Sequence, residues 1–141
     1  MNIRHITSKD FTSIRQIEHQ CFPSKERCSK EKLWKRLLRN MEETYVLEVD
    51  GKIVSYLSGE DTDGFLFIHT LACLKEYQNH GYGTMLLSEA KKDALKKKKK
   101  GLRLLSKEKN IQYYQRFGFK EVTYESPSWH MMELDMEETK K

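Results

Sequence analysis

A glycine-containing loop at residues 78–84 is the clearest chemical signal in the sequence. It reads Gln-Asn-His-Gly-Tyr-Gly-Thr, follows an apolar run and leads into a segment of helical periodicity. The start of a helix presents unpaired N–H groups and the positive end of the helix dipole, which favour a phosphate. Gly81 and Gly83 would let the backbone approach a bulky pyrophosphate, and Thr84 would add a hydroxyl. The loop therefore predicts a phosphate-binding site, although it matches neither a dinucleotide fingerprint nor a Walker loop.

Two further side chains could move a proton. His69 lies within the apolar run that precedes the loop, and an imidazole titrates near neutral pH, so it could act as a base. On the residues alone, a histidine satisfied inside the core is the commoner interpretation. Glu60 is a second candidate base, although a solvated carboxylate in a turn is the more ordinary interpretation of its position.

The three cysteines, Cys21, Cys28 and Cys73, predict no redox or metal chemistry. Their number is odd and no CxxC or Cys/His cluster occurs, so we expect reduced thiols and neither a disulfide framework nor a metal site. Two of them lie near apolar positions, where a core role is commoner than a nucleophilic one.

Regular elements are expected on both sides of the loop. An apolar stripe at helical spacing predicts a helix that Ser8 caps and Pro23 ends, and Ser29 could cap a second helix with the stripe Leu33, Trp34, Leu37 and Leu38. Further helices are expected over 83–99 and 110–117, the latter ended by Gly118. Strands are expected at 3–6, 45–49, 53–57, 65–74, 102–105, 119–124 and 129–134.

The turns between these strands complete the expected fold. Asp50-Gly51 is typical of a two-residue hairpin, residues 60–64 read as a turn, and Pro127 lies in the turn before the last strand. The almost continuously apolar run 65–74 indicates a central strand buried on both faces. Strands and helices in this order predict an α/β fold, a mixed sheet with helices on its faces.

Length and charge limit the classes of function. The 141 residues fit one domain, which we place at 1–136, followed by a polar tail at 137–141. Much of the net charge of +5 comes from lysines, including the run 96–100. A solvated helix end explains that run better than nucleic-acid contact, although its field could also attract an anionic ligand. Neither a membrane span nor a secretory signal is visible, so a cytoplasmic location is expected.

A second motif makes the loop specific. Gln-x-x-Gly-x-Gly between an apolar strand and a helix resembles the acetyl-CoA loop of the GCN5-related N-acetyltransferases, the GNAT superfamily. Residues 114–119, Tyr-Gln-Arg-Phe-Gly-Phe, look like the family's Tyr-x-x-x-Gly-Phe segment, and 17–23 and 49–54 also match its usual pattern. The resemblance covers nearly the whole chain. It implies a mostly antiparallel sheet of six to seven strands flanked by about four helices.

Within the superfamily, the sequence is most similar to the arylalkylamine N-acetyltransferases. Ile68-His69-Thr70-Leu71-Ala72 resembles their strand motif, and residues 113–119 are very similar to theirs. The animal enzymes carry His-x-His on this strand, whereas the first position here is Phe67. The resemblance implies acetyl transfer from acetyl-CoA to a primary amine, a small arylalkylamine or a polyamine, by direct attack on the thioester.

The resemblance also implies roles for individual residues. Tyr114 would be the general acid that protonates the departing sulfur, with His69 or Glu60 as the base. The backbone of Leu71, Ala72 and Cys73 would pair with the pantetheine arm like an added strand. Phe22, Pro23 and Trp34 are candidates for the amine pocket, although each suits the core equally well. The remaining expected acetyl-CoA contacts are Gln78, Asn79, His80, Gly81, Tyr82, Gly83 and Thr84.

Other functions stay open at this point. The acceptor could be a protein N-terminus or a lysine, and the chain could be a non-catalytic acyl-CoA sensor or a nucleic-acid-binding module. A pure binder has no need of an acid at Tyr114, which favours an enzyme. We therefore expect acetyl-CoA and a small amine as ligands, no metal, no nucleic acid and no membrane partner, and either a monomer or a homodimer.

Overall fold

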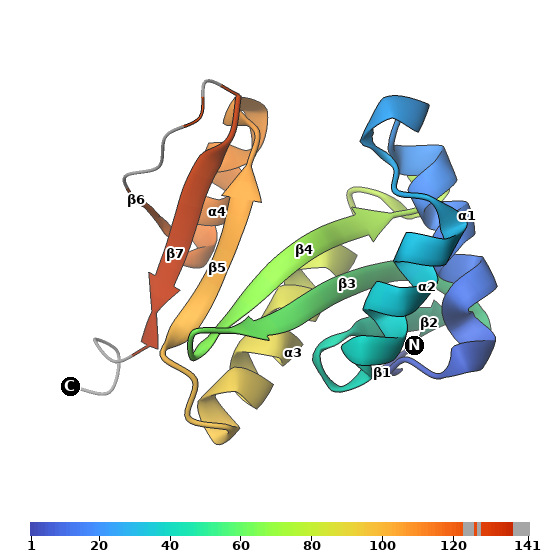
Figure 1. Cartoon of the computed structure of the whole chain (residues 1–141), viewed down its shortest axis with the longest axis horizontal. Coiled ribbons are helices and arrows are strands. Elements are labelled where there is room, and N and C mark those ends of the chain that lie inside the picture. Colours follow the sequence, from blue (N-terminus) through green and yellow to red (C-terminus); the bar gives the residue numbers. More distant parts are fainter. Residues whose placement is uncertain (123–125, 127, 137–141) are drawn as a thin grey trace.

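A seven-stranded sheet organises the chain, with strand order β1-β2-β3-β4-β5-β7-β6 (Figure 1). The computed structural model describes residues 1–122, 126 and 128–136. Only β4 and β5 pair in parallel, and every other neighbouring pair is antiparallel. The strands are β1 Asn2–His5, β2 Tyr45–Val49, β3 Lys52–Thr62, β4 Phe65–Cys73, β5 Gly101–Ser106, β6 Lys120–Val122 and β7 His130–Asp135.

Four α-helices cover the two faces of this sheet. They are α1 Phe11–Cys21, α2 Lys30–Arg39, α3 Tyr82–Lys96 and α4 Ile111–Phe117. Figure 1 shows α1 and α2 in front of the sheet and α3 behind it. The buried residues of α3 are the predicted stripe Leu86, Leu87, Ala90 and Ala94. The expected mixed, mostly antiparallel sheet with about four helices is confirmed.

The first two helices differ from expectation in their details. Ser8 is not the N-cap of the first helix, because a short 3-10 turn over Ser8–Asp10 precedes α1. Thr7 is the N-cap of that turn, and Asp10 is the N-cap of α1. Ser29 caps α2 as predicted, its hydroxyl accepting from the Lys32 N–H at 3.2 Å. Leu38 was expected in the buried stripe of α2, but 58% of it is exposed. Leu33 and Leu37 are fully buried and Trp34 is partly buried against the core, so the stripe lacks Leu38 and is narrower than predicted.

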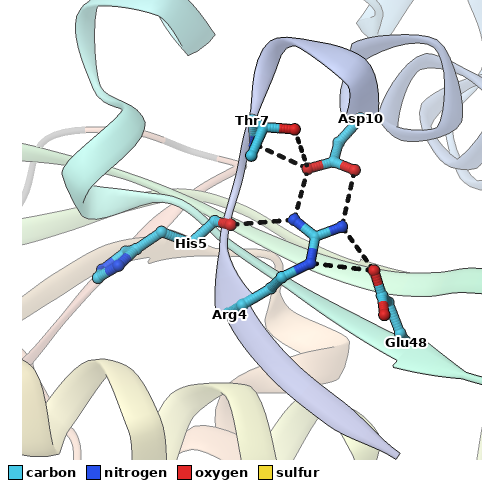
Figure 2. Close-up of polar contacts among 5 residues, drawn as sticks. All are labelled: Arg4, His5, Thr7, Asp10 and Glu48. Carbon is cyan, nitrogen blue, oxygen red and sulfur yellow. Dashed lines mark hydrogen bonds and ion pairs between the residues drawn. The ribbon is translucent and has the colours of Figure 1, made fainter.

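An ionic cluster joins β1 to the start of α1 and to β2 (Figure 2). The guanidinium of Arg4 donates two hydrogen bonds to the Asp10 carboxylate, at 2.8 and 3.0 Å, and also binds Glu48. The Thr7 N–H donates to the same carboxylate at 2.7 Å. Bidentate pairing of this kind fixes orientation as well as adding stability. The Arg4 guanidinium lowers the pKa of Asp10, which is 4% exposed.

Within the β2–β3–β4 meander, one of the two turns differs from the prediction. Asp50 and Gly51 both have positive φ, 51° and 78°, as the two-residue hairpin requires. The next turn consists of Asp63 and Gly64, with φ of 53° and 86°, because β3 continues to Thr62. Glu60 therefore lies within a strand and not in the predicted turn. Its cross-strand partner is Phe67 of β4.

The most important departure concerns β4, which is not buried on both faces. Its residues alternate between buried and more exposed, with Leu66, Ile68 and Ala72 buried. Pairing with β5 runs only from Phe65↔Gly101 to Ile68↔Leu104. Beyond Ile68, β4 and β5 separate, and Figure 1 shows the resulting opening. The apolar run predicted burial, but the divergence of the two strands leaves the second half of β4 without a neighbour on that side.

A β-bulge lies at the point of separation. Ser58 pairs with Thr70 and Gly59 with Ile68, so His69 is the extra residue of β4. Bulges bend a strand and redirect its side chains, and they are frequent beside active sites. The bulge also breaks the regular alternation of side chains along β4. The Leu71 side chain lies near Gly83, at the start of α3.

The helix α3 ends within the lysine run 96–100, and part of this run contacts the sheet. The helix ends at Lys96, three residues before the predicted end, and Lys98 has a positive φ of 58°. Lys99 forms an ion pair with Asp61 at 2.8 Å and is only 15% exposed. Part of the run is therefore structural. Residues 123–125, 127 and 137–141, which include Pro127, the end of a predicted strand and the predicted tail, lie outside the described residues.

Candidate acyl-CoA site

A cavity of about 470 Å³ occupies the opening between β4 and β5. Residues 68–71 of β4 and the end of β5 at 104–106 form two of its walls. Tyr114 of α4 and the segment that follows α1, which includes Phe22 and Pro23, form the others. We call this the central cavity. Five residues predicted for the site, His69, Leu71, Tyr114, Phe22 and Pro23, thus lie around one space.

The backbone of β4 is open along this cavity. The Leu74 N–H donates to Val54 of β3 at 2.9 Å. Since backbone groups in an antiparallel pair alternate in direction, those of Ala72 also face β3, whereas those of Leu71 and Cys73 face the opening. The Cys73 carbonyl accepts from the Cys21 thiol at 3.1 Å and from the Gln78 side-chain amide at 3.0 Å. Ala72 is therefore a weaker candidate than its neighbours for pairing with a bound arm.

The glycine loop forms a cradle before α3. Asn79 and Gly81 have positive φ, 65° and 80°, and Gly81 is the N-cap of the helix. This conformation turns the chain so that the first N–H groups of α3 are free of intrahelical partners. The His80 ring stacks on Tyr82, with centroids 5.5 Å apart, and so folds over its own loop. A second cavity of about 180 Å³ lies here, the loop cavity, lined by Cys73, Tyr77, Gln78, Asn79, Gly81, Tyr82, Gly83, Thr84 and Tyr113.

Tyr113 and Tyr114 point into different cavities. The Tyr113 hydroxyl lies 2.8 Å from the Thr84 hydroxyl and thereby joins α4 to the start of α3. A Cβ at Gly83 would stand 3.4 Å from the Tyr113 oxygen, so glycine leaves room for this approach. Tyr113 thus lines the loop cavity. Tyr114 lines the central one.

Tyr114 is suited to giving up a proton. Burial, together with the neighbouring Tyr113, raises the pKa of Tyr114 to about 12. Its ring packs edge-on against Phe119, with centroids 5.7 Å apart. A phenol with a raised pKa is protonated at neutral pH, and its ring is held in place, so it can serve as a proton donor at the cavity wall.

His69 is suited to accepting a proton. Its Nε2 lies 3.1 Å from Oε1 of Glu60, and Arg39 lies 3.7 Å from the same carboxylate oxygen. Burial lowers the pKa of His69. The hydrogen bond that His69 donates to Glu60 acts in the opposite direction, and the charge of Arg36 lowers the pKa further. The imidazole is therefore neutral at physiological pH, with 28% of the side chain exposed. Glu60 reaches the site through His69 and does not line the central cavity.

The cysteines show no sign of nucleophilic character. Burial raises the pKa of Cys21 and of Cys73, so both are thiols at neutral pH. All three cysteines are free. Among the described residues, no group of three or more His, Cys, Asp or Glu side chains could hold a metal ion. In the same part of the chain, no helix has both the length and the apolar character needed to cross a membrane.

The predicted acceptor residues divide into two groups. Phe22 and Pro23 line the central cavity. Trp34 lines neither cavity, because its ring packs edge-on against Phe11 at 5.4 Å between α1 and α2. Of the two interpretations weighed for Trp34, its contact with Phe11 favours the core one.

Other residues at the site were not predicted. Lys107 and Trp129 line the central cavity, and the Lys107 ammonium lies 5.5 Å from the centre of the Trp129 ring. They meet because β5 pairs with β7 up to Ser106↔His130. Thr70 and Glu26 also face this space. No local pattern could have identified these four residues, since strand pairing brings their segments together.

The arrangement suits a long thioester ligand with a phosphate-bearing end. A cradle at a helix N-terminus, an open strand edge and a proton donor lie in sequence along the opening. The chain belongs to the acetyltransferase (GNAT) family, whose family model matches residues 11–119. The family-level prediction is confirmed.

Individual relatives agree with this assignment. A curated relative, an uncharacterized N-acetyltransferase of Methanocaldococcus jannaschii, is 34% identical over 87 residues, which are 62% of this chain and 54% of that protein. The match thus spans about half the length of that relative. The PaiA N-acetyltransferase of Thermoplasma acidophilum, solved in complex with coenzyme A, is similar with a TM-score of 0.83 and 20% identity, over 95% of this chain and 98% of that chain.

A further solved structure has the same fold. The ribosomal-protein-S18-alanine N-acetyltransferase of Escherichia coli has a TM-score of 0.78 and 20% identity, over 95% of this chain and 92% of that chain. At such identities the likeness concerns the fold. The acceptor is a separate question that belongs to the residues of the site.

Proposed function

We propose that the chain transfers an acetyl group from acetyl-CoA to a primary amine. One observation supports this most strongly. His69, a neutral base, and Tyr114, a protonated acid, line the same cavity at the point where β4 separates from β5. A site that only binds an acyl-CoA needs neither group in these protonation states.

The chain offers separate contacts for the two ends of acetyl-CoA. The N–H groups at the start of α3, with Gly81, Gly83 and Thr84, suit the pyrophosphate. The free edge of β4 at Leu71 and Cys73 suits the amide groups of the pantetheine arm. Gln78 would act mainly by holding the Cys73 carbonyl, and Asn79, His80 and Tyr82 by shaping the loop. The lysines at the end of α3 contribute positive field for the anionic ligand.

His69 and Tyr114 would then divide the proton transfers. An alkylamine has a pKa of about 10, so it must lose a proton before it can attack. His69 accepts that proton, directly or through a water molecule, and the amine nitrogen forms a bond to the acetyl carbonyl carbon. As the carbon–sulfur bond breaks, Tyr114 donates its proton to the sulfur. The nitrogen loses its second proton as the amide forms, and this proton restores Tyr114. The products are an N-acetylated amine, free CoA and the proton held by His69, which leaves to solvent.

The acceptor would be a small primary amine. The resemblance to arylalkylamine acetyltransferases favours an arylalkylamine, with a polyamine as the other candidate. The aromatic ring of Phe22 and the exposed Trp129 at the cavity wall suit an apolar substituent. Glu60 belongs to the site through its hydrogen bond to His69.

A direct assay tests this function. Purified protein is mixed with acetyl-CoA and a panel of amines and peptides, thiol release is followed, and the product is identified by mass spectrometry. We expect turnover of small amines that falls about 100-fold or more in Tyr114→Phe while CoA affinity is retained. Binding of CoA without turnover of any acceptor would indicate a sensor, and turnover of peptides alone would indicate a protein acetyltransferase. Absence of CoA binding would refute the proposal.

A further inference from the structure

A third cavity of about 270 Å³, the side cavity, adjoins the central one. The two share His69, Thr70 and Phe22, so the space is continuous past the proposed base. The side cavity also reaches Glu18 of α1 and Arg36 of α2, which the central cavity does not. Its volume suits a small molecule rather than a cofactor.

Glu18 carries a buried carboxylate without a hydrogen-bonded or ion-paired partner. The residue is 4% exposed, and among the described residues its side chain forms neither a hydrogen bond nor an ion pair, although Arg36, Arg27 and Arg15 act on it electrostatically. Burial raises the pKa of Glu18, while Arg36 is the largest influence in the opposite direction. Burying an acid group without a partner costs free energy. Such a position usually implies either a protonated acid or a ligand that supplies the partner.

A second residue that lines the side cavity has an unsatisfied polar atom. Nε of Arg36 is buried and has no hydrogen-bond partner among the described residues. Tyr56 of β3 is fully buried and interacts electrostatically with Glu18. Native proteins satisfy the large majority of buried polar groups, so the two exceptions at Glu18 and Arg36 need an explanation. Their position beside a cavity that also contains the proposed base His69 indicates a site for a polar ligand.

The remaining charges of the side cavity neutralise one another. Glu26 forms an ion pair with Lys107, and His69 is hydrogen-bonded to Glu60, which lies outside the cavity lining and also contacts Arg39. Glu18 and Arg36 are left as a separated negative and positive group. The ligand that complements such a pair carries an ammonium and, a short distance away, a carboxylate or carbonyl oxygen. A plain alkylamine would leave Arg36 unpaired, and a polyamine would place a second cation near it.

Resting on the proposed acetyl transfer, we infer that the acceptor is an α-amino acid or an α-aminoacyl compound. Its ammonium lies between Glu18 and His69, and its carboxylate or carbonyl oxygen accepts hydrogen bonds from Arg36. Phe22, Cys28 and Trp129, which line the same cavity, receive the side chain. Glu18 and Arg36 are specificity-determining residues in this arrangement. The acceptor then carries a carboxylate or carbonyl group that the alkylamine implied by the family resemblance lacks.

Matched acceptors test this inference. Each of several amino acids, such as phenylalanine, valine and alanine, is compared with its carboxamide and with the amine that remains when its carboxyl group is removed. We expect KM for the best amino acid or its amide to be about 10-fold or more below that of the matching amine, because a hydrogen-bonded charge is gained. Comparing KM for the amino acid with KM for its amide shows whether the recognised group is a free carboxylate or a peptide-like carbonyl.

Variants assign the effect to residues. Arg36→Gln should remove the preference by raising KM for the amino acid and the amide but not for the amine. Arg36→Lys should restore part of it, since lysine keeps the charge and loses the planar fork. Glu18→Gln, which keeps the shape, should raise KM for all three compounds about 10-fold. Lys35→Gln, on the same helix and 73% exposed, is the matched control and should change none of these values.

Equilibrium binding tests recognition of the acceptor independently of the proposed acetyl transfer. Calorimetry with CoA-loaded protein measures acceptor affinity without turnover. Amino acid binding that Arg36→Gln abolishes would support the side cavity even if no acetyl transfer occurred. Equal KM and affinity for the amino acids and their decarboxylated amines, or an unchanged preference in Arg36→Gln with native thermal stability, would overturn it.

Discussion

Nε2 of His69 lies 3.1 Å from Oε1 of Glu60, across the pair of strands β3 and β4. The bulge that makes His69 an extra residue of β4 occurs where that strand leaves β5. The same irregularity therefore opens the cavity and places the imidazole at its edge. Glu60 orients the ring from the adjacent strand, and Arg39 contacts Glu60 from α2.

The first prediction concerns the pH dependence of catalysis. Burial lowers the pKa of His69, so the free base persists below the ordinary histidine value of about 6.5. We expect kcat/KM to fall on the acidic side of its pH profile. This acidic limb should lie below that value, where the pH drops through the pKa of His69 in the folded state. Glu60→Gln should move the limb to lower pH, because Glu60 raises the pKa of His69. Arg39→Gln should move it to higher pH.

These shifts are measured as pH–rate profiles of the variants with one acceptor, so that titration of the amine cancels in the comparison. His69→Gln should reduce kcat about 100-fold or more and remove the limb. An acidic limb that stays in place in Glu60→Gln and His69→Gln alike would show that another group is the base.

The second prediction separates the two adjacent tyrosines. Tyr113→Phe removes the hydrogen bond to Thr84 that joins α4 to the start of α3. A neutral hydrogen bond contributes about 1 kcal/mol, so CoA affinity measured by calorimetry should fall about fivefold. Tyr114→Phe, its matched control one residue away, should lose turnover and keep CoA affinity. The opposite pattern would contradict the assignment of the two tyrosines to different cavities.

The third prediction concerns the closeness of β5 and β7. A Cβ at Gly101 would stand 2.1 Å from the carbonyl oxygen of Leu134, which is backbone and cannot move aside. Gly101→Ala should therefore lower the free energy of unfolding by about 3 kcal/mol or more, measured by urea denaturation. Gly83→Ala, where the nearest atom would be 3.4 Å away, serves as the comparison and should change stability little. Equal stability of both variants and the parent would argue against this β5–β7 register.

The fourth prediction concerns the cluster of Arg4 and Asp10. Because Arg4 lowers the pKa of Asp10 in the folded state, this group stabilises the fold above the unfolded-state value of about 3.9. That stability is lost as pH falls through the lowered pKa. Asp10→Asn should lower the free energy of unfolding by about 2 kcal/mol at pH 7.

The same variant should flatten the dependence of stability on pH in the acid range, as followed by thermal melts. Asp50→Asn, in the exposed hairpin turn, provides a control for the loss of one negative charge. A melt of Asp10→Asn that matches the Asp50→Asn melt at every pH would show that the Arg4 pair adds no stability.

Local sequence determined most of the elements. The helical spacing of apolar residues, the cap at Ser29 and the Asp50-Gly51 turn produce their elements through interactions between near neighbours. The glycine loop before α3 belongs to this class, because its positive φ angles and its position at a helix start follow from Asn79 and Gly81 themselves. The order of elements and the family motifs were then sufficient to predict the sheet, and they indicate the glycine loop as the donor site.

Tertiary structure decided what surrounds the donor site. The bulge at His69, the separation of β4 from β5 and the strand that carries Glu60 depend on pairing between distant segments, which no local pattern encodes. Leu38 was misplaced because helical spacing defines a stripe but not its width. Glu18 and Arg36 meet at one cavity only because α1 and α2 pack on the same face of the sheet. The sequence by itself therefore identified the loop that suits acetyl-CoA, and only the folded chain brought together the charges proposed to select the amine.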